Sequence, residues 1–252
     1  MKLKVMSFNI RCANDPDGHS IEERAPRVKS ILDKYAPDLV GIQEYRPAWE
    51  ESFVGGICDG YEMYYVPREF TNNKEATPVM WRSEAFECLE KKTFWLSDTP
   101  EEESRGWDEK YNVNRICSFV LLKHKKSGKV FCFMNTHFGF GDKCQTQSAE
   151  LIYKYSKAFG DIPAFCTGDY NMRPTSLGYG KMTEFFTDVN SVTEKYEGCT
   201  FHGYDPESHP QSLIDFCFIN GQVTPVSCKV IKDTFDGKYP SDHYPIICEL
   251  EL

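Results

Sequence analysis

Apolar runs separated by polar turns dominate the first part of the chain. Residues 3–10 (LKVMSFNI) and 37–44 (PDLVGIQE) are short apolar runs that are typical of buried strands. Between them, residues 25–35 carry apolar side chains at helical spacing, and Pro26 would be tolerated in the first turn of such a helix. A strand, a helix and a strand within so short a span predict a βαβ unit.

The middle of the chain predicts several strands and one long loop. Residues 97–112 are polar and acidic and predict an exposed loop, with Trp95 packed in the core at its foot. Residues 115–123 and 129–137 flank the turn HKKSG and give the strongest hairpin signal in the chain. Further short strands are expected near residues 61–66, 77–81 and 86–96.

The last part of the chain adds a helix and three strands. Residues 142–159 show helical spacing, and strands are expected over residues 162–171, 212–220 and 244–252. Because local hairpins occur together with crossover connections, we expect mixed rather than purely parallel sheets in an α/β protein. No repeat, low-complexity tract or linker divides the chain, so we predict a single domain over residues 1–252.

Composition narrows the class of protein. The chain has 252 residues, and its 40% hydrophobic content is that of an ordinary globular protein. The formal net charge of −9 does not favour nonspecific binding to nucleic acid or to anionic membranes. No apolar stretch approaches the ~20 residues that span a bilayer, and the first residues lack the apolar region of a signal peptide. We therefore expect a cytoplasmic protein with no membrane partner, and a monomer.

The 11 cysteines do not indicate a metal or redox motif. They are scattered, mostly within apolar runs, and no two have CxxC spacing. We therefore expect buried, reduced thiols rather than a zinc site or a disulfide framework.

Polar side chains recur where the predicted strands end. Asp169 and Asn171 end one such strand and, two residues apart, are expected to point to the same side. Each polar residue alone is typical of a solvated loop or of a satisfied structural contact. Together at one edge of a sandwich, however, they would suit a hard divalent cation such as Mg²⁺ or Mn²⁺. The other members of this set are Asn9, Glu44, His137, Asp215, Asp242 and His243.

At these positions the chain resembles the endonuclease/exonuclease/phosphatase superfamily. The segments FNIR, GIQE, NTHF, GDYN, LIDFCFI and SDHYPI occur in the family's order and at roughly its spacing, from Asn9 to His243. The resemblance implies a four-layer α/β (α+β) sandwich, with two mixed sheets face to face and helices on both outer faces. One difference is Tyr170, where family members often have phenylalanine or another residue.

The resemblance also implies roles for the acidic residues and the histidines. Glu44 would be the main metal ligand, with Asn9 and Asp242 close to the metal or its waters. Asp169 would orient or deprotonate the attacking water, while His243, backed by Asp215, would contact the scissile phosphate.

The remaining roles concern the phosphate. Asn171 would hold the phosphate or the water, and His137 would help with the phosphate or the leaving group. Arg115, at the start of the strand RICSFV, is a further candidate for a phosphate contact.

The resulting hypothesis is an Mg²⁺- or Mn²⁺-dependent hydrolase of a phosphodiester or phosphomonoester, similar to bacterial members of unassigned substrate. A compact phosphorylated small molecule is favoured, because the hairpin tip is the only basic cluster in the sequence and the acids Glu101, Glu102 and Glu103 would repel extended polyanions. The loop that carries them would form a wall beside the metal. A nuclease acting on DNA or RNA is the main alternative. A catalytically silent binding module and a carboxylic ester hydrolase are remoter ones.

Overall fold

The computed structural model describes residues 1–72, 74–209 and 212–252. Its first sheet has the strand order β11-β12-β1-β2-β4-β3, and its second has the order β5-β6-β7-β8-β10-β9. The first sheet is built from β1 (Lys2–Asn9), β2 (Leu39–Gln43), β3 (Tyr61–Tyr64), β4 (Val79–Arg82), β11 (Thr224–Val230) and β12 (Ile246–Glu251). The second is built from β5 (Phe86–Trp95), β6 (Ile116–His124), β7 (Val130–His137), β8 (Ala164–Asp169), β9 (Thr187–Asp188) and β10 (Asp215–Ile219).

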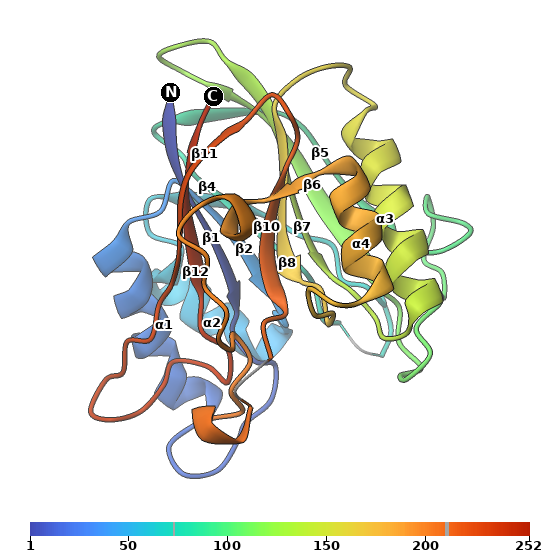
Figure 1. The fold of residues 1–252 in the computed structure, drawn as a ribbon. Coiled ribbons are helices and arrows are strands. Elements are labelled where there is room, and N and C mark those ends of the chain that lie inside the picture. Colours follow the sequence, from blue (N-terminus) through green and yellow to red (C-terminus); the bar gives the residue numbers. More distant parts are fainter. Residues whose placement is uncertain (73, 210–211) are drawn as a thin grey trace.

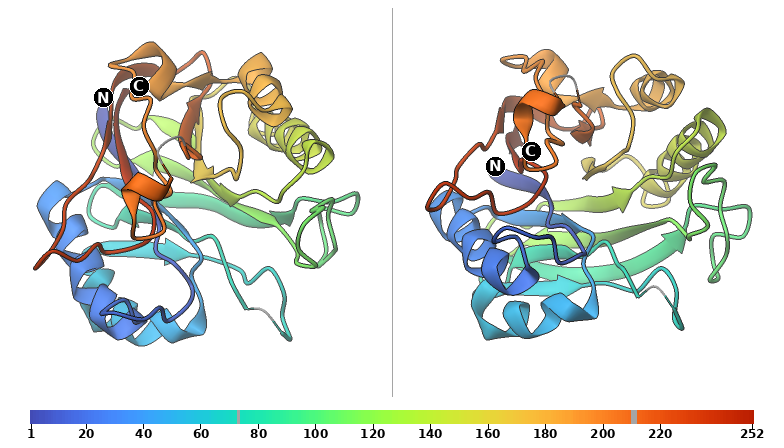
Figure 2. Two further views of the ribbon diagram at one scale, coloured as in Figure 1. Left: turned by 60° about the horizontal axis from the view of Figure 1, so that its bottom comes forward. Right: turned by 90° about the horizontal axis from the view of Figure 1, so that it is seen from below.

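Helices cover both outer faces of the paired sheets (Figures 1 and 2). One group lies against the first sheet: α1 (Ile21–Tyr35), the short α2 (Glu50–Ser52), and single helical turns at Pro47–Trp49 and Phe53–Ile57. The other outer face carries α3 (Asp142–Ser156) and α4 (Leu177–Phe185). The remaining short helices are α5 (Val189–Val192) and a turn at Pro206–Ser208. The expected four-layer sandwich with two mixed sheets is confirmed.

Three apolar clusters fill the spaces between the layers. The first lies between the two sheets, the second between the first sheet and α1, and the third between the second sheet and the pair α3 and α4. Trp95 is buried in its strand, as expected, and donates its indole N–H to the carbonyl of Arg68. All 11 cysteines are free thiols, and most are buried. No helix in the described ranges is both long and apolar enough to cross a membrane.

The sequence-based boundaries were least accurate at turns and caps. Helix α1 begins at Ile21 rather than at residue 25, because Ser20 and Glu23 form a capping box ahead of it. Pro26 therefore lies beyond the first turn. The sequence analysis did not predict α4 or β11. The acidic segment 97–112 is only partly exposed, because Asp108 within it is buried.

A buried polar bridge joins the two sheets beneath the ends of the central strands. Gln43 of β2 donates to the side-chain oxygen of Asn135 in β7 at 2.7 Å, and Thr167 of β8 donates to the same oxygen at 3.1 Å. Gly41 makes room for this bridge, since a Cβ atom there would lie 2.1 Å from the Thr167 hydroxyl. The bridge fixes the distance between the sheets where the functional residues gather.

Candidate active site

Strand register in the second sheet brings three of the expected residues together. Asp169, the last residue of β8, pairs with Asp215 of antiparallel β10 and with His137 of parallel β7. Because residues paired across neighbouring strands lie side by side, these positions are set by the ladder itself. Asn171 lies just beyond the strand in a left-handed turn (φ 47°), and it still lines the same cavity as Asp169.

The first sheet supplies the other half of the site. Strands β1 and β2 run parallel, so Asn9 and Glu44 leave the sheet at the same edge. Strand β12 pairs antiparallel with β1, and Asp242 and His243 precede it at that edge. Strand ends from both sheets thus direct their polar side chains into one space, although the residues are far apart in the sequence.

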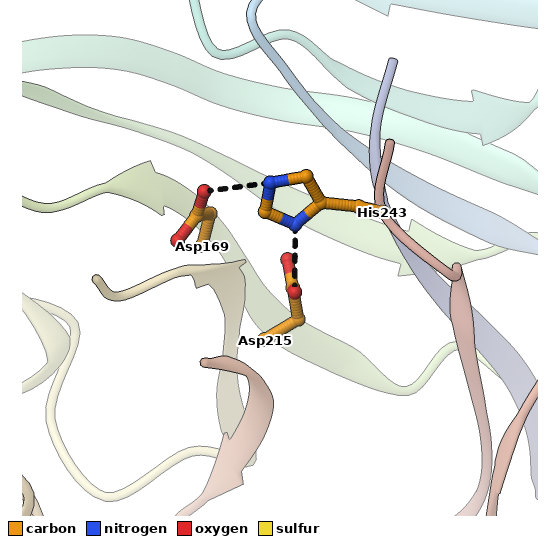
Figure 3. Close-up of side chains that lie close together, drawn as sticks. All are labelled: Asp169, Asp215 and His243. Atoms are coloured by element: carbon orange, nitrogen blue, oxygen red, sulfur yellow. Dashed lines mark hydrogen bonds and ion pairs between the residues drawn. The ribbon is translucent and has the colours of Figure 1, made fainter. Parts of the chain in front are cut away.

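His243 lies between two carboxylates (Figure 3). Its Nδ1 atom is 2.9 Å from Asp215, and its Nε2 atom is 3.7 Å from Asp169. Burial opposes the charged imidazolium, but the negative charges of Asp215 and Asp169 outweigh burial and raise the pKa of His243 to about 10. Burial and the charge of Asp215 raise the pKa of Asp169 to about 7. The ligand atoms of these three residues lie within 4.8 Å of one another, close enough to hold a cation or to share protons.

Asn9 connects the metal-ligand candidate Glu44 to this triad. Its amide nitrogen donates to Glu44 at 3.1 Å and to Asp169 at 3.0 Å, while its oxygen accepts the backbone N–H of Arg11. The amide oxygen expected near a metal is therefore engaged with the backbone. Asn9 acts here as a bridge between two carboxylates.

Glu44 and Asp242 lie beside the same guanidinium. Different nitrogens of Arg11 lie 3.9 Å from Glu44 and 3.6 Å from Asp242, so one extended cation lies near both carboxylates. Burial opposes ionisation of Glu44, but the hydrogen bonds from Cys12 and the positive charge of His243 outweigh it and hold the pKa of Glu44 below its usual value. Arg11 and Glu44 both have a backbone φ of 62°. This left-handed conformation is uncommon for residues other than glycine and persists only where the surrounding structure requires it.

Asn171 orients its neighbours rather than presenting free donors. Its side-chain nitrogen lies 3.0 Å from both His137 Nε2 and the carbonyl of Phe138, and its backbone N–H donates to Asp169. Tyr170, between the two site residues, points away into the core and donates to the Cys166 carbonyl. Tyr170 therefore contributes to the packing beneath the sheet and not to the site.

His137 has a partner that the sequence analysis did not identify. Glu75 is buried 3.7 Å from His137 Nδ1 and pairs with Arg68 at 2.6 Å. Burial, reinforced by the charge of Arg115, holds the pKa of His137 well below its usual value, so the imidazole is neutral. Glu75 precedes the apolar run TPVMW. The polar residues around Glu75 are those of an exposed loop, so nothing in the local sequence indicates that this carboxylate is buried.

A cavity of about 610 Å³ opens over these residues. Its lining includes four carboxylates (Glu44, Glu75, Asp169 and Asp242) and six basic residues (Arg11, Arg46, Arg68, Lys110, Arg115 and Arg173). The hairpin tip is therefore not the main basic cluster of this protein, contrary to the expectation from sequence. The basic residues come from separate segments, and the fold concentrates them around the site.

Two expectations about the cavity wall have different outcomes. Arg115 does reach the cavity, where it is buried and pairs with Asp108 at 2.9 Å. The acidic residues 101–103 do not line the cavity: Glu101 contacts Lys92 and Tyr155, and Glu103 accepts a backbone N–H from Phe70. The wall beside the site comes from residues 110–115 instead, so the predicted acidic wall is wrong.

A model of the Endonuclease/Exonuclease/phosphatase family matches residues 6–243. This range contains every strand-end residue described above. The chain belongs to this family. The similarity to solved members extends over nearly the whole chain. A family protein from Bacteroides thetaiotaomicron is 30% identical, with a TM-score of 0.91, over 99% of this chain and 95% of that chain.

Two further relatives have named activities. A structure described as a mannosyl-6-phosphatase of Bacteroides thetaiotaomicron is 30% identical with a TM-score of 0.90, and the match covers 99% of this chain and 100% of that chain. Tyrosyl-DNA phosphodiesterase 2 of Danio rerio is 23% identical over 98% of this chain and 66% of the relative. The chain thus spans about two thirds of the length of the curated relatives it matches. Family members are phosphoesterases, which act on phosphodiesters, phosphomonoesters or nucleic acids.

Proposed function

We propose that this protein is a metal-dependent phosphoric ester hydrolase, and that residues 1–252 act as one catalytic domain. One observation carries the proposal: His243 lies between Asp215 and Asp169 at a cavity lined by six basic residues. Acid–base groups beside a concentration of positive charge suit hydrolysis of a phosphate ester.

Glu44 and Asp242 are the residues that would hold Mg²⁺ or Mn²⁺. Their shared contact with Arg11 supports this assignment, and carboxylate oxygens are the ligands that these ions prefer. A bound ion would neutralise charge on the phosphoryl oxygens. Asn9 would keep Glu44 in place through its hydrogen bond.

Asp169 is the residue proposed to accept a proton from the attacking water. A pKa of about 7 suits a general base near neutral pH. A large fraction of the carboxyl groups is then ionised, and the carboxylate still has a high affinity for a proton. The N–H groups of Asn9 and Asn171 hold its two carboxylate oxygens, which fixes its orientation. We propose that the water attacks phosphorus in line with the leaving group.

His243 is proposed to bind the scissile phosphate, and Arg115 to contact a phosphate of the substrate. The imidazolium of His243 stays charged through neutral pH because Asp215 stabilises it. Neutral His137, with Nε2 3.0 Å from Asn171 and a buried Nδ1 3.7 Å from Glu75, is proposed to help with the phosphate or the leaving group without adding charge. Asn171 is assigned an orienting role, since its amide is engaged with His137 and Phe138.

A compact phosphorylated small molecule is the substrate we favour. The size of the cavity, about 610 Å³, and the 30% identity with a structure described as a mannosyl-6-phosphatase support a sugar phosphate or a similar monoester. The bacterial origin of that relative also supports a bacterial enzyme, and we propose that it works in the cytoplasm as a monomer.

A nuclease-like function is the second candidate. The similarity to tyrosyl-DNA phosphodiesterase 2 and the basic cavity lining both favour it. Arginines that contact phosphates would serve a short single strand as well as a small molecule.

A substrate panel with and without metal tests the proposal. We expect release of inorganic phosphate from sugar phosphates that requires Mg²⁺ or Mn²⁺ and disappears in EDTA. Glu44→Gln and Asp169→Asn are the active-site controls. Cleavage of oligonucleotides with no turnover of sugar phosphates would favour the nuclease, and metal-independent turnover would contradict the assignment of Glu44.

A further inference from the structure

One wall of the cavity is formed by residues 110–115, a segment that contains none of the strand-end residues described above. Lys110, on this segment, holds its ammonium 4.4 Å from the ring centre of Phe140 and 5.0 Å from that of Tyr111. Among the residues that the structure describes, no carboxylate lies within ion-pair distance of Lys110. Two aromatic rings thus hold the Lys110 ammonium at the cavity wall, where no carboxylate neutralises its charge.

Asp108 fixes this wall from beneath. One of its oxygens accepts the backbone N–H groups of Lys110 at 2.9 Å and Tyr111 at 3.0 Å, and the other accepts from Arg115 at 2.9 Å. The Asp108 side chain is fully buried. Gly139 allows this close packing, because a Cβ atom there would lie 2.8 Å from Asp108. Lys110 and Arg115 are therefore held by one carboxylate.

Arg173 adds a second cation without a negative partner. It lines this cavity and also a neighbouring cavity of about 290 Å³. Over residues 1–72, 74–209 and 212–252, its guanidinium forms no ion pair. Together with Lys110 and Arg115 it places three positive charges on the lining, of which Asp108 balances one.

We propose that Lys110, Arg115 and Arg173 form a subsite for a second anionic group of the substrate, and that Asp108 is its positioning residue. This inference rests on the proposed hydrolase function and narrows its substrate to a small molecule with two anionic groups. Lys110 and Arg173 are exposed and have no carboxylate partner among the described residues, so an anionic group would gain charge-assisted contacts that a neutral hydroxyl would not. The Lys110 ammonium lies over one face each of Tyr111 and Phe140, which leaves less aromatic surface for a stacked base.

Binding measured in EDTA tests the subsite without turnover. Short alkanediol bisphosphates of increasing chain length are compared by calorimetry with alkyl monophosphates of the same length. We expect one length of bisphosphate to bind ~10-fold or more tightly than its monophosphate, as a charge-assisted contact supplies. Lys110→Ala should remove most of this preference and leave monophosphate affinity within ~2-fold. Lys126→Ala, at the exposed hairpin tip, is the matched control and should change neither.

Asp108→Asn tests the positioning role. It retains an acceptor for the two backbone N–H groups but removes the charge that holds Arg115. We expect it to lower the preference for bisphosphate at a temperature where it remains folded, and we expect Asp108→Glu to restore part of it. A loss of thermal stability with an unchanged preference would overturn the positioning role.

Three outcomes would overturn the subsite itself. They are equal affinity for both ligand series at every length, an equal loss for both in Lys110→Ala, and a larger Lys110 contribution to binding of a short single-stranded oligonucleotide. Binding is measured without turnover. If the protein prefers bisphosphates but hydrolyses no phosphate ester, the proposed function is wrong and the subsite stands.

Discussion

Replacing Asp215 with asparagine would remove the negative charge behind His243 while keeping the shape of the side chain. The carboxylate lies 2.9 Å from Nδ1 of the imidazole, and both groups are buried. The folded protein raises the pKa of His243 to about 10 from an ordinary value of 6.5. That difference corresponds to about 5 kcal/mol in favour of the charged form.

The Asp215 charge is large enough to account for this difference. At an effective dielectric constant of about 20, opposite charges at this separation attract by about 6 kcal/mol. Asp169, at 3.7 Å, contributes less, and burial opposes both. We therefore expect Asp215→Asn to lower the pKa of His243 by at least about two units, and kcat by on the order of 10²- to 10⁴-fold.

NMR titration of the histidine ring protons in EDTA measures the pKa directly, with His243→Ala to assign the signal. The folded pKa of His243 lies above its unfolded value. The stability it adds is therefore complete below about pH 6.5 and is lost as the pH rises to about 10. The difference in unfolding free energy between wild type and Asp215→Asn should shrink across the same range. A wild-type His243 that titrates near pH 6.5, or that keeps its pKa in Asp215→Asn, would refute this reasoning.

Three further predictions concern the sheets, the metal and the base. Gly41→Ala should destabilise the protein by ~1–3 kcal/mol in thermal unfolding, because the new methyl group would clash with Thr167. Gly180→Ala, within helix α4 and with open space around it, should not destabilise the protein, and equal melting temperatures of wild type and Gly41→Ala would show that the sheets can separate without cost. EDTA should abolish turnover, and adding Mg²⁺ or Mn²⁺ should restore it in wild type but not in Glu44→Gln. Full activity of the metal-stripped enzyme would exclude a catalytic role for the metal. Asp169→Asn should lower kcat ~10²-fold or more in steady-state assays, and a near-normal kcat would mean that another group accepts the proton.

The local pattern of apolar and polar residues was sufficient to predict most of the central strands and many residues of the candidate site. Alternating or continuous apolar runs must be buried, so β1, β2, β8 and β12 could be predicted from period and composition alone. Polar residues that interrupt or end such runs, such as Asp169 and Asp215, are costly unless partnered, which marked them as candidates. The family resemblance then gave these positions a common chemistry, and the match over residues 6–243 confirmed the family.

The partners of those residues could be identified only in the tertiary structure. Glu75 lies in a short polar stretch and Asp108 in an acidic loop, and nothing local separates either from a solvated carboxylate. Each is buried against an arginine seven residues away along the chain, Arg68 or Arg115, and only the folded path of the intervening loop brings the two charges together. The basic cavity has the same origin, since its six cations are scattered along an acidic chain. Periodicity determines which face of an element is buried, whereas charge pairing depends on how the loops fold back and on which segments the packed sheets bring together.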